Sequence, residues 1–304
     1  MNSSTDFSRR YALIVFAMML VFLGGAEYVT RAYVIPIPNR IASVVHTMYT
    51  ADSPDAVIGD SHIYRDFMRE KEFANLSKGG FSIPQMKQVA ELYYRDIKPG
   101  RIIFEASPQL LGESRLDKVP EDRMFTLSKR SPVLLYIFDP VIGGGMKRLD
   151  KLRSFAKLKR ERNEGETQRN AEGGWATVPP ETRKEAAAER IEHQRPVWNE
   201  ATEMHLRQYK EMIESLKGRG ADICLLHTPV DAMYLDLLEA DPSFTKANAT
   251  FKSIAEEVGV RYVDFRGLDM EFELDHFLNQ DHLTPRASER FSEIAKRACF
   301  GEAH

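Results

Sequence analysis

The sequence has little cysteine and almost no excess of charge of one sign. Its two cysteines, Cys224 and Cys299, are too few for the disulfide framework of a small secreted domain. Cys224 lies in the apolar run "ICLL", where we expect it to act as a small buried apolar residue. With 42 Lys and Arg against 45 Asp and Glu, the net charge of −3 provides no broad basic surface for a nucleic-acid backbone. We therefore expect no nucleic-acid partner.

The chain also lacks the common motifs of metal and phosphate binding. Its histidines and carboxylates show no close ligand spacing such as H-E-x-x-H. The "GGG" run at 143–145 has neither the Lys-Ser/Thr pair nor the preceding strand of a phosphate-binding loop. We expect no metal and no cofactor. The length of 304 residues, 43% of them hydrophobic, predicts one large globular domain with appendages.

One long apolar run is present, and it follows Arg9 and Arg10 near the N-terminus. Its uncharged stretch from Tyr11 to Ala26 is slightly short for a membrane span of about 17–25 residues and long for a signal-peptide core of about 7–15. Both fates remain open, and we favour an uncleaved single-pass anchor in the inner (cytoplasmic) membrane. The paired arginines predict a cytoplasmic N-terminus and an extracytoplasmic, periplasmic bulk. The expected segments are cytoplasmic residues 1–10, an anchor at 11–33, a linker with a short helix at 34–53, and the main domain at 54–300.

The main domain alternates short apolar strands with helical patterns. Strands are predicted in "DAVIG", "FANL", "GRIIFEAS", "ADICLLHTP" and "VRYVDF", and helical spacing of apolar residues separates most of them. This alternation predicts an α/β fold with a parallel sheet of about five strands, "DAVIG" at its centre and helices on both faces. An insertion at about 110–195 is expected to form helices and then a mobile loop or lid that leads into an exposed helix.

Ser61 follows the first predicted strand in "DAVIGDSH", at the edge where such sheets bind ligands. A serine there can attack an ester if a histidine takes its proton, or it can simply cap the next helix. His282 lies in a polar loop, "NQDHLTP", which leads into an amphipathic helix. Taken singly, a helix cap and a surface loop residue are the ordinary roles, but together on this sheet the two residues favour a catalytic site. His62 either helps to orient an incoming chain or caps the turn.

Several segments resemble a known family. "IGDSH" and "NQDHLTPRASERF" resemble the first and last blocks of the SGNH (GDSL) hydrolase superfamily, and "NLSKGGFS" resembles its second block. The branch that the chain resembles most is membrane-anchored and extracytoplasmic, related to alginate acetylation and teichoic-acid D-alanylation proteins. Its "PxxYL"-like segment is similar to "TPVDAMYL" here. The resemblance covers about residues 55–110 and 220–298, and it implies a flavodoxin-like three-layer sandwich.

The same resemblance implies roles for individual residues. Ser61 is the expected nucleophile and His282 the expected base. The oxyanion donors are expected to be the backbone N–H groups of Ser61 and of Gly79 or Gly80. The binding residues expected around them are Asp60, His62 and Ser107.

Two departures from the family pattern affect this site. Asn279 stands three residues before His282, where the family has its aspartate, and asparagine cannot supply the negative charge that stabilises an imidazolium. Asp281 could replace that aspartate, or a Ser-His dyad could work with a backbone carbonyl that orients the ring. No Gly-x-Asn-Asp block follows "RIIFEAS", so the usual asparagine donor to the oxyanion is missing and Ser107 or Gln109 is left for that role.

The expected function is that of an O-acetyltransferase or esterase acting on a cell-envelope or secreted polysaccharide, with a polytopic membrane acyltransferase as a candidate partner. The alternative is a non-catalytic saccharide-binding or assembly subunit of an envelope polysaccharide complex, which Asn279 and the missing block favour. A soluble lipase is disfavoured because the chain lacks the full set of hydrolase blocks.

Overall fold

The computed structural model describes residues 3–29, 44, 47–48, 51–67, 72–118, 174–266 and 272–301. Most of the linker predicted at 34–53 lies outside the described residues. So do residues 119–173, which hold the "GGG" run and most of the predicted insertion. The helices, loop and lid expected there stay predictions.

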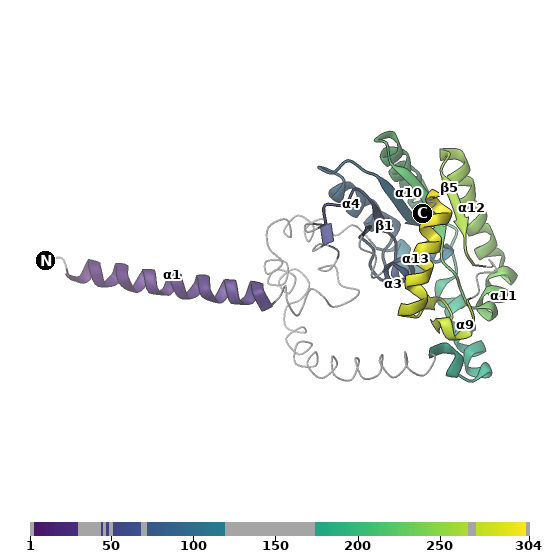
Figure 1. Ribbon diagram of the computed structural model, residues 1–304, viewed down its shortest axis with the longest axis horizontal. Coiled ribbons are helices and arrows are strands. Elements are labelled where there is room, and N and C mark those ends of the chain that lie inside the picture. Colours follow the sequence, from purple (N-terminus) through teal and green to yellow (C-terminus); the bar gives the residue numbers. More distant parts are fainter. Residues whose placement is uncertain are drawn as a thin grey trace.

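Five parallel strands form the central sheet of the domain (Figure 1). They are β1 (Ala56–Ile58), β2 (Ala74–Asn75), β3 (Arg101–Glu105), β4 (Asp222–His227) and β5 (Arg261–Asp264). Every neighbouring pair is parallel, and the strand order is β2-β1-β3-β4-β5. The predicted α/β fold with a five-stranded parallel sheet is confirmed, and this order is the flavodoxin-like one.

The predicted central position of "DAVIG" is wrong. The middle strand is β3, and β1 lies between β2 and β3. The chain adds only β2 on one side of β1 and then crosses back to add three strands on the other side. β1 is nevertheless buried over its whole length, because strands flank it on both sides.

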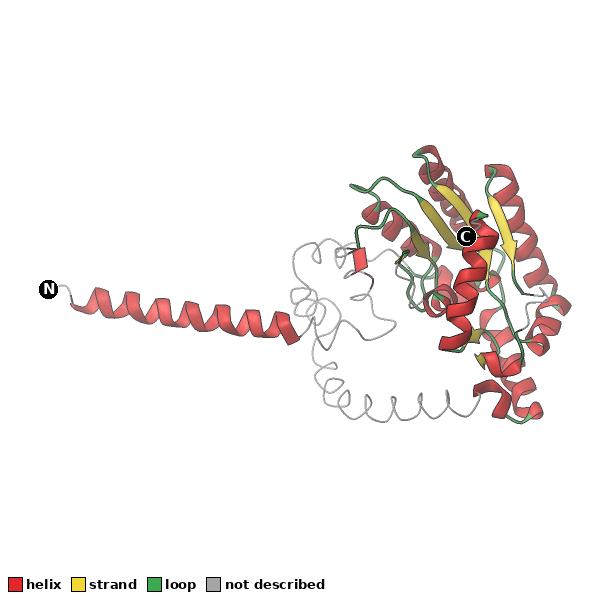
Figure 2. Cartoon of the chain, in the orientation of Figure 1, coloured by secondary structure: helices red, strands yellow, loops and turns green. Residues whose placement is uncertain are grey.

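Helices cover both faces of the sheet (Figure 2). One face carries α4 (Ile83–Tyr93), α10 (Glu200–Gly218) and α12 (Pro242–Val258). The other face carries α3 (Ser61–Asp66) and α13 (Pro285–Phe300). Ala56 and Ile58 pack in the core cluster of the first face, and Val57 packs in that of the second. Since successive side chains of a strand point to opposite faces, this continuous apolar run requires cover on both sides.

Polar caps and glycines set the ends of the long helices. Asn199 and Asp241 begin α10 and α12, because their side-chain oxygens accept hydrogen bonds from the backbone N–H groups of Thr202 and Ser243. α12 ends at Gly259, whose φ of 70° lies in the left-handed region that glycine adopts without strain.

A separate core cluster joins α9 (Pro180–Gln194) to α11 (Ala232–Ala240). Ala187 and Ile191 of α9 are buried in it with Tyr234 of α11. The prediction of an exposed helix is wrong for this side of α9. Ala187 and Ile191 lie four positions apart and form a narrow apolar stripe within an otherwise charged sequence. The composition of the segment therefore did not indicate that one side of α9 is buried.

The other described elements are short. They are η2 (Pro108–Leu111), α5 (Glu113–Leu116), η3 (Gly174–Thr177), η4 (Leu274–His276), β6 (Phe277–Asn279) and β7 (His282–Leu283). β6 and β7 form an antiparallel hairpin in place of the polar loop that the sequence predicts before α13. Gln280 and Asp281 make its turn, and Thr284 then caps α13 by accepting a hydrogen bond from the N–H of Ala287.

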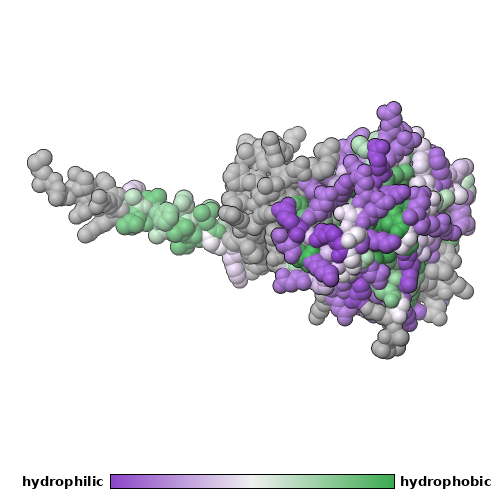
Figure 3. All heavy atoms as spheres, turned by 90° about the horizontal axis from the view of Figure 1, so that it is seen from above, coloured by the Kyte–Doolittle hydropathy of each residue, from purple (hydrophilic) through white to green (hydrophobic). Residues whose placement is uncertain are grey.

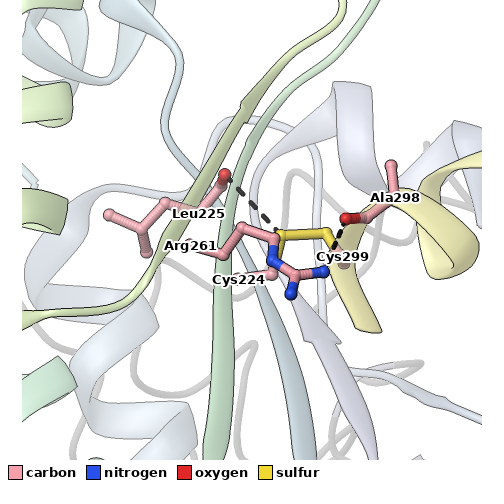
Figure 4. Close-up of a disulfide and its surroundings, with 5 residues drawn as sticks. All are labelled: Cys224, Leu225, Arg261, Ala298 and Cys299. Atoms are coloured by element: carbon pink, nitrogen blue, oxygen red, sulfur yellow. Dashed lines mark hydrogen bonds between the residues drawn. A yellow bond between two sulfur atoms is a disulfide. The ribbon is translucent and has the colours of Figure 1, made fainter. Parts of the chain in front are cut away.

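A disulfide joins Cys224 of β4 to Cys299 of α13 (Figure 4). The expectation that Cys224 is only a small buried apolar residue is therefore wrong. The two cysteines are 75 positions apart and meet because α13 packs on β4, which no pattern in the sequence indicates. Beside the bond, Arg261 Nη1 donates a hydrogen bond to the Ala298 carbonyl at 2.8 Å. The disulfide fixes α13 to the sheet. By closing a loop of this length it also lowers the entropy of the unfolded chain, which stabilises the folded state by about 4 kcal/mol.

The N-terminal apolar run forms a helix, α1 (Ser3–Val29). Large apolar side chains between Tyr11 and Leu23 are exposed along it, as the green segment in Figure 3 shows. Judged on the residues described, neither α1 nor any other helix qualifies as a membrane span by its length and hydropathy. The membrane anchor stays a prediction.

Candidate active site

The turn from β1 into α3 provides the first part of the site. Asp60 caps α3, since its Oδ1 accepts a hydrogen bond from the His62 backbone N–H at 3.0 Å. Ser61 is the first residue of the helix, and the capping role considered for it belongs to Asp60. Gly59 permits close packing here, because a Cβ at this position would lie 2.6 Å from Oε2 of Glu105.

A cavity of about 290 Å³ opens at Ser61. Its walls come from the start of α3, the loop after β2, η2, α5 and α9. The lining residues are Ser61, Gly79, Gly80, Gln109, Ser114, Arg115, Arg190, His193 and Gln194. The structure thus brings Ser61 to the same cavity as the two glycines expected to donate to an oxyanion, and Gln109 lies there as well.

The loop at Gly79 and Gly80 lines this cavity and has backbone donors that are not used within the protein. Within the described part of the chain, the N–H groups of both glycines donate no hydrogen bond. Gly80 has a φ of 79°, and a Cβ there would lie 3.1 Å from Nζ of Lys118, which itself donates to the Gly80 carbonyl at 2.6 Å. A glycine is required because larger residues are strained at this φ. Both N–H groups therefore remain available to an anion.

His62 of α3 and His282 of β7 are both buried and stack on each other, with ring centroids 4.7 Å apart. Nδ1 of His62 lies 2.8 Å from Oδ1 of Asp60, and its Nε2 lies 3.1 Å from Oδ2 of Asp281. Nδ1 also lies 2.8 Å from Nε2 of Gln109, but carboxylate oxygens face both ring nitrogens, and this favours the doubly protonated ring. Burial alone would lower the pKa of His62, but the Asp60 charge and the hydrogen bonds to Asp281, Asp60 and Glu105 raise it well above its usual value. His62 is therefore an imidazolium held between two carboxylates.

His282 has the opposite protonation state. Its Nδ1 lies 2.8 Å from Oδ1 of Asp281 and 3.1 Å from Oδ1 of Asn279, so Nδ1–H is the donor and Nε2 is left as an acceptor. Burial lowers the pKa of His282 to about 4, although the Asp281 charge opposes the shift, and the charge on His62 adds to the lowering. The ring is neutral at pH 7, which is the state that a general base requires.

Three buried carboxylates surround the two histidines. Burial alone would raise the pKa of Asp281, but its contacts with His282 and His62 hold that pKa well below the usual range. Burial likewise would raise the pKa of Asp60, and the charges and hydrogen bonds of His62, together with the Arg115 charge, outweigh it and lower the value. Burial and the neighbouring Asp60 charge raise the pKa of Glu105 to about 7.

Arginine and amide donors complete this network. Arg190 Nε and Gln194 Nε2, both on α9, donate to Oδ2 of Asp281 at 2.8 and 3.1 Å. Arg115 Nη2 donates to Oδ2 of Asp60 at 3.0 Å. Gln109 Nε2 donates to Oε1 of Glu105 at 2.8 Å. Each buried carboxylate therefore has several charged or amide partners, as burial of charge requires.

Two groups of side chains in the network have the composition of metal sites. They are His62 with Asp281 and His282, and His62 with Asp60 and Glu105, with donor atoms within 4.8 Å of one another in each group. Arg190 and Arg115, however, bind directly to the aspartates of these groups and would repel a cation. The donors fit a hydrogen-bonded charge network better than a metal centre.

Six of the residues that the sequence indicates do not line the cavity: Asp60, His62, Ser107, Asn279, Asp281 and His282. Ser107 is buried, and its hydroxyl has no hydrogen-bond partner among the described residues. The ring of His282 stacks on that of His62, which is the residue after Ser61. Within the described residues no hydrogen bond joins the Ser61 hydroxyl to the His282 ring, so Ser61 would have to turn toward Nε2 to react.

Sequence reasoning missed Glu105, Arg115, Arg190 and Gln194. A signal existed for Glu105, because a carboxylate at the end of the apolar run "IIFE" has to be buried with a partner. Arg190 and Gln194 gave no such signal, since they lie in the charged run of α9 that resembles a solvated surface. Only the packing of α9 beside the hairpin turn brings them to Asp281.

Comparison with known proteins does not identify a family for this chain. No protein-family model matches the sequence, and no curated protein matches it. Among solved structures, the chain is similar to a presumed acylhydrolase from Bacteroides fragilis, with 10% sequence identity over 90% of this chain and 94% of that one, and a TM-score of 0.40. At that score the backbones agree only in part, so the functional argument depends on the geometry of the site.

The pKa values of the two stacked histidines should be shifted in opposite directions from the ordinary value, upward for His62 and downward for His282. At pH 6 we expect the His282 ring to be neutral with its proton on Nδ1, and at pH 7.5 we expect the His62 ring to be an imidazolium. Ring ¹⁵N chemical shifts of the full chain measure both states. The urea-unfolded chain is the control, because both rings should then titrate near the ordinary value of about 6.5. Midpoints near that value for both rings in the folded protein would contradict the charge network.

Proposed function

We propose that the protein transfers or hydrolyses an acyl ester, most readily acetyl, through a covalent intermediate on Ser61. The observation that carries the proposal is the geometry of His282, whose Nδ1 is bonded to the buried carboxylate of Asp281 and whose ring stacks on His62 of α3, the residue after Ser61. A histidine oriented in this way by an acid activates a serine hydroxyl. Asp281 provides the acid that Asn279 cannot.

The reaction would proceed in two balanced steps. His282 Nε2 takes the proton of the Ser61 hydroxyl as the oxygen attacks the acyl carbonyl, and the same ring then gives that proton to the departing alcohol. The resulting acyl-Ser61 is attacked by water or by a sugar hydroxyl, whose proton passes to His282 and returns to Ser61. The backbone N–H groups of Gly79 and Gly80 would stabilise the negative oxygen in both steps.

The donor set for the oxyanion differs from that of the resembling family. The asparagine of its third block is absent here, and the side chain at the cavity on η2 is Gln109. Its amide already donates to Glu105. Ser107, which the sequence offered for this role, does not line the cavity, so the two glycines are the donors that the geometry favours.

The proposed setting is the outer side of the cytoplasmic membrane, with an acylated envelope or secreted polysaccharide as substrate. The disulfide between Cys224 and Cys299 supports this setting, since such bonds persist in oxidising compartments such as the periplasm. The apolar run of α1 behind Arg9 and Arg10 supports an anchor with the domain outside. A polytopic membrane acyltransferase that delivers the acyl group is a proposed partner by analogy.

The second candidate function is a non-catalytic saccharide-binding or assembly subunit. It is favoured by the missing oxyanion asparagine and by the lack, among the described residues, of a hydrogen bond between Ser61 and His282. In this case the cavity would bind a glycan and Ser61 would do no chemistry. The two functions differ in the reactivity of Ser61.

Ser61 should react with a fluorophosphonate probe. We expect a single covalent adduct on Ser61 when the purified full chain is treated and analysed by peptide mass spectrometry, because a serine with a neutral histidine base is nucleophilic. Ser61→Ala should abolish labelling and acyl transfer together. Ser114→Ala, which changes another serine at the same cavity, should still be labelled. An unlabelled Ser61 in a folded protein would favour the binding subunit over the enzyme.

The proposed topology has its own test. Alkaline phosphatase, which is active only outside the cytoplasm, should be active when fused after the last residue, because the domain follows an anchor whose arginines stay inside. A fusion after Arg10, before the apolar run, is the matched control and should be inactive. Activity of a cytoplasmic reporter at the C-terminal fusion point would overturn the assignment.

A further inference from the structure

Glu105 is a buried carboxylate that the proposed reaction does not use. It is the last residue of β3, and its side chain is fully buried. Among the described residues its one ionic partner is His62, whose Nδ1 lies 3.4 Å from Oε1 of Glu105 but 2.8 Å from Oδ1 of Asp60. A buried charge whose ionic partner is this distant lowers the stability of a fold, and such costs are typical of functional sites.

The two oxygens of Glu105 bind two segments that meet at the cavity. Oε2 accepts a hydrogen bond from the Asp60 N–H at 2.5 Å, in the turn that leads into Ser61. Oε1 accepts a hydrogen bond from Gln109 Nε2 at 2.8 Å, and Gln109 lines the cavity together with Ser61. Gly59 permits this close approach, because a Cβ there would lie 2.6 Å from Oε2. One carboxylate therefore joins the Ser61 turn to η2.

Both hydrogen bonds are strongest when the carboxylate is ionised. Protonation places an O–H on one of the two oxygens, and that oxygen then becomes a poorer acceptor for its N–H partner. The groups that face Glu105 are Asp60 and His62 from the α3 turn, Gln109 from η2, and Tyr209 of α10, whose hydroxyl donates to the Glu105 carbonyl at 2.7 Å. Burial and the Asp60 charge raise the pKa of Glu105 to about 7, so the two forms exchange near neutral pH.

We propose that Glu105 is a positioning residue, whose ionised carboxylate holds the Ser61 turn and Gln109 in the reactive arrangement. The inference rests on the proposed function, since it assigns Glu105 a part in the reactivity of Ser61. Glu105 does not line the cavity, so it acts through the backbone of Asp60 and not on the substrate. A shift of this turn would move both the Ser61 hydroxyl and the Ser61 N–H, which is one of the expected oxyanion donors. A displacement of about 1 Å at a reacting group is enough to slow a reaction about 100-fold.

The rate at which a fluorophosphonate labels Ser61 in the purified full chain, measured from pH 5 to 8.5, tests the proposal without a variant. We expect the wild-type rate to rise with pH through a midpoint near 7, because ionised Glu105 holds both hydrogen bonds. His282, with a pKa of about 4, is already neutral over this range. A wild-type rate that does not change over this range would overturn the proposal.

Glu105→Gln assigns the midpoint to this residue. The variant is isosteric, but its amide retains an acceptor for only one of the two N–H donors. At pH 8 we expect labelling of Ser61 to fall about ten-fold or more, and the midpoint near 7 to disappear. Glu113→Gln, which removes an exposed carboxylate from α5, is the matched control and should retain the wild-type rate and midpoint. A wild-type profile in Glu105→Gln would contradict the role.

Thermal unfolding distinguishes positioning from a structural role. Because the pKa of Glu105 is raised in the folded state, that state binds more protons than the unfolded chain between about pH 4.3 and 7, and stability falls as the pH rises through this window. Glu105→Gln removes this loss, so its Tm relative to wild type should be higher at pH 8 than at pH 5. At pH 8 it should equal or exceed the wild-type value. A variant that does not fold, or that loses Tm and labelling together, would assign Glu105 a structural role instead.

The outcome is separable from that of the proposed function. If the probe labels Ser61 equally fast in wild type and Glu105→Gln, the enzyme stands and the positioning role falls. If wild-type Ser61 reacts at no pH, the enzyme falls, and the role of Glu105 falls with it.

Discussion

The buried carboxylate of Asp281 holds the candidate site together. Its Oδ1 accepts from His282, and its Oδ2 is shared by His62, Arg190 and Gln194. A charge removed from water is stable only when partners replace the lost hydration. Here the partners come from three elements: β7, α3 and α9. The contact with Asp281 helps to raise the pKa of His62 well above its usual value, whereas burial keeps His282 neutral against the opposing charge of Asp281.

The contacts of Asp281 also depend on how the surrounding elements pack. The hairpin that carries Asp281 runs through Thr284 into α13, which the disulfide to Cys224 fixes on the sheet. α9 reaches Asp281 from the last part of the insertion, and α3 brings His62 and Ser61 from the end of β1. Three segments that are distant in sequence therefore meet at the carboxyl edge of a parallel sheet, the position where such sheets place ligands.

The sheet could be predicted because its signals are local. Short apolar runs, most of them separated by helical spacing, identify the five strands of the central sheet, and the "GDSH" turn marks its edge. The contacts between elements that are distant in the sequence could not be predicted in the same way. The pairing of Cys224 with Cys299 and the position of α9 depend on which helix packs on which strand, and a charged helix with a narrow apolar stripe resembles a solvated one.

The acid was ambiguous from the sequence for a geometric reason. A residue adjacent to a histidine normally points away from it, so Asp281 looked a weaker candidate than a residue three positions before. The tight turn between β6 and β7 reverses that expectation, because it directs the side chains of both Asp281 and Asn279 to Nδ1 of His282. Asp281 is the nearer of the two and carries the charge that an imidazolium requires.

The rate at which a fluorophosphonate labels Ser61 in Asp281→Asn, measured beside Asn279→Ala, tests this account most directly. We predict a fall of about 10²–10⁴-fold for Asp281→Asn, because His282 loses the charge that fixes its tautomer, and less than about ten-fold for Asn279→Ala. Far-UV circular dichroism confirms that both variants are folded. Labelling of Asp281→Asn at the wild-type rate, or a large loss confined to Asn279→Ala, would contradict the role of Asp281.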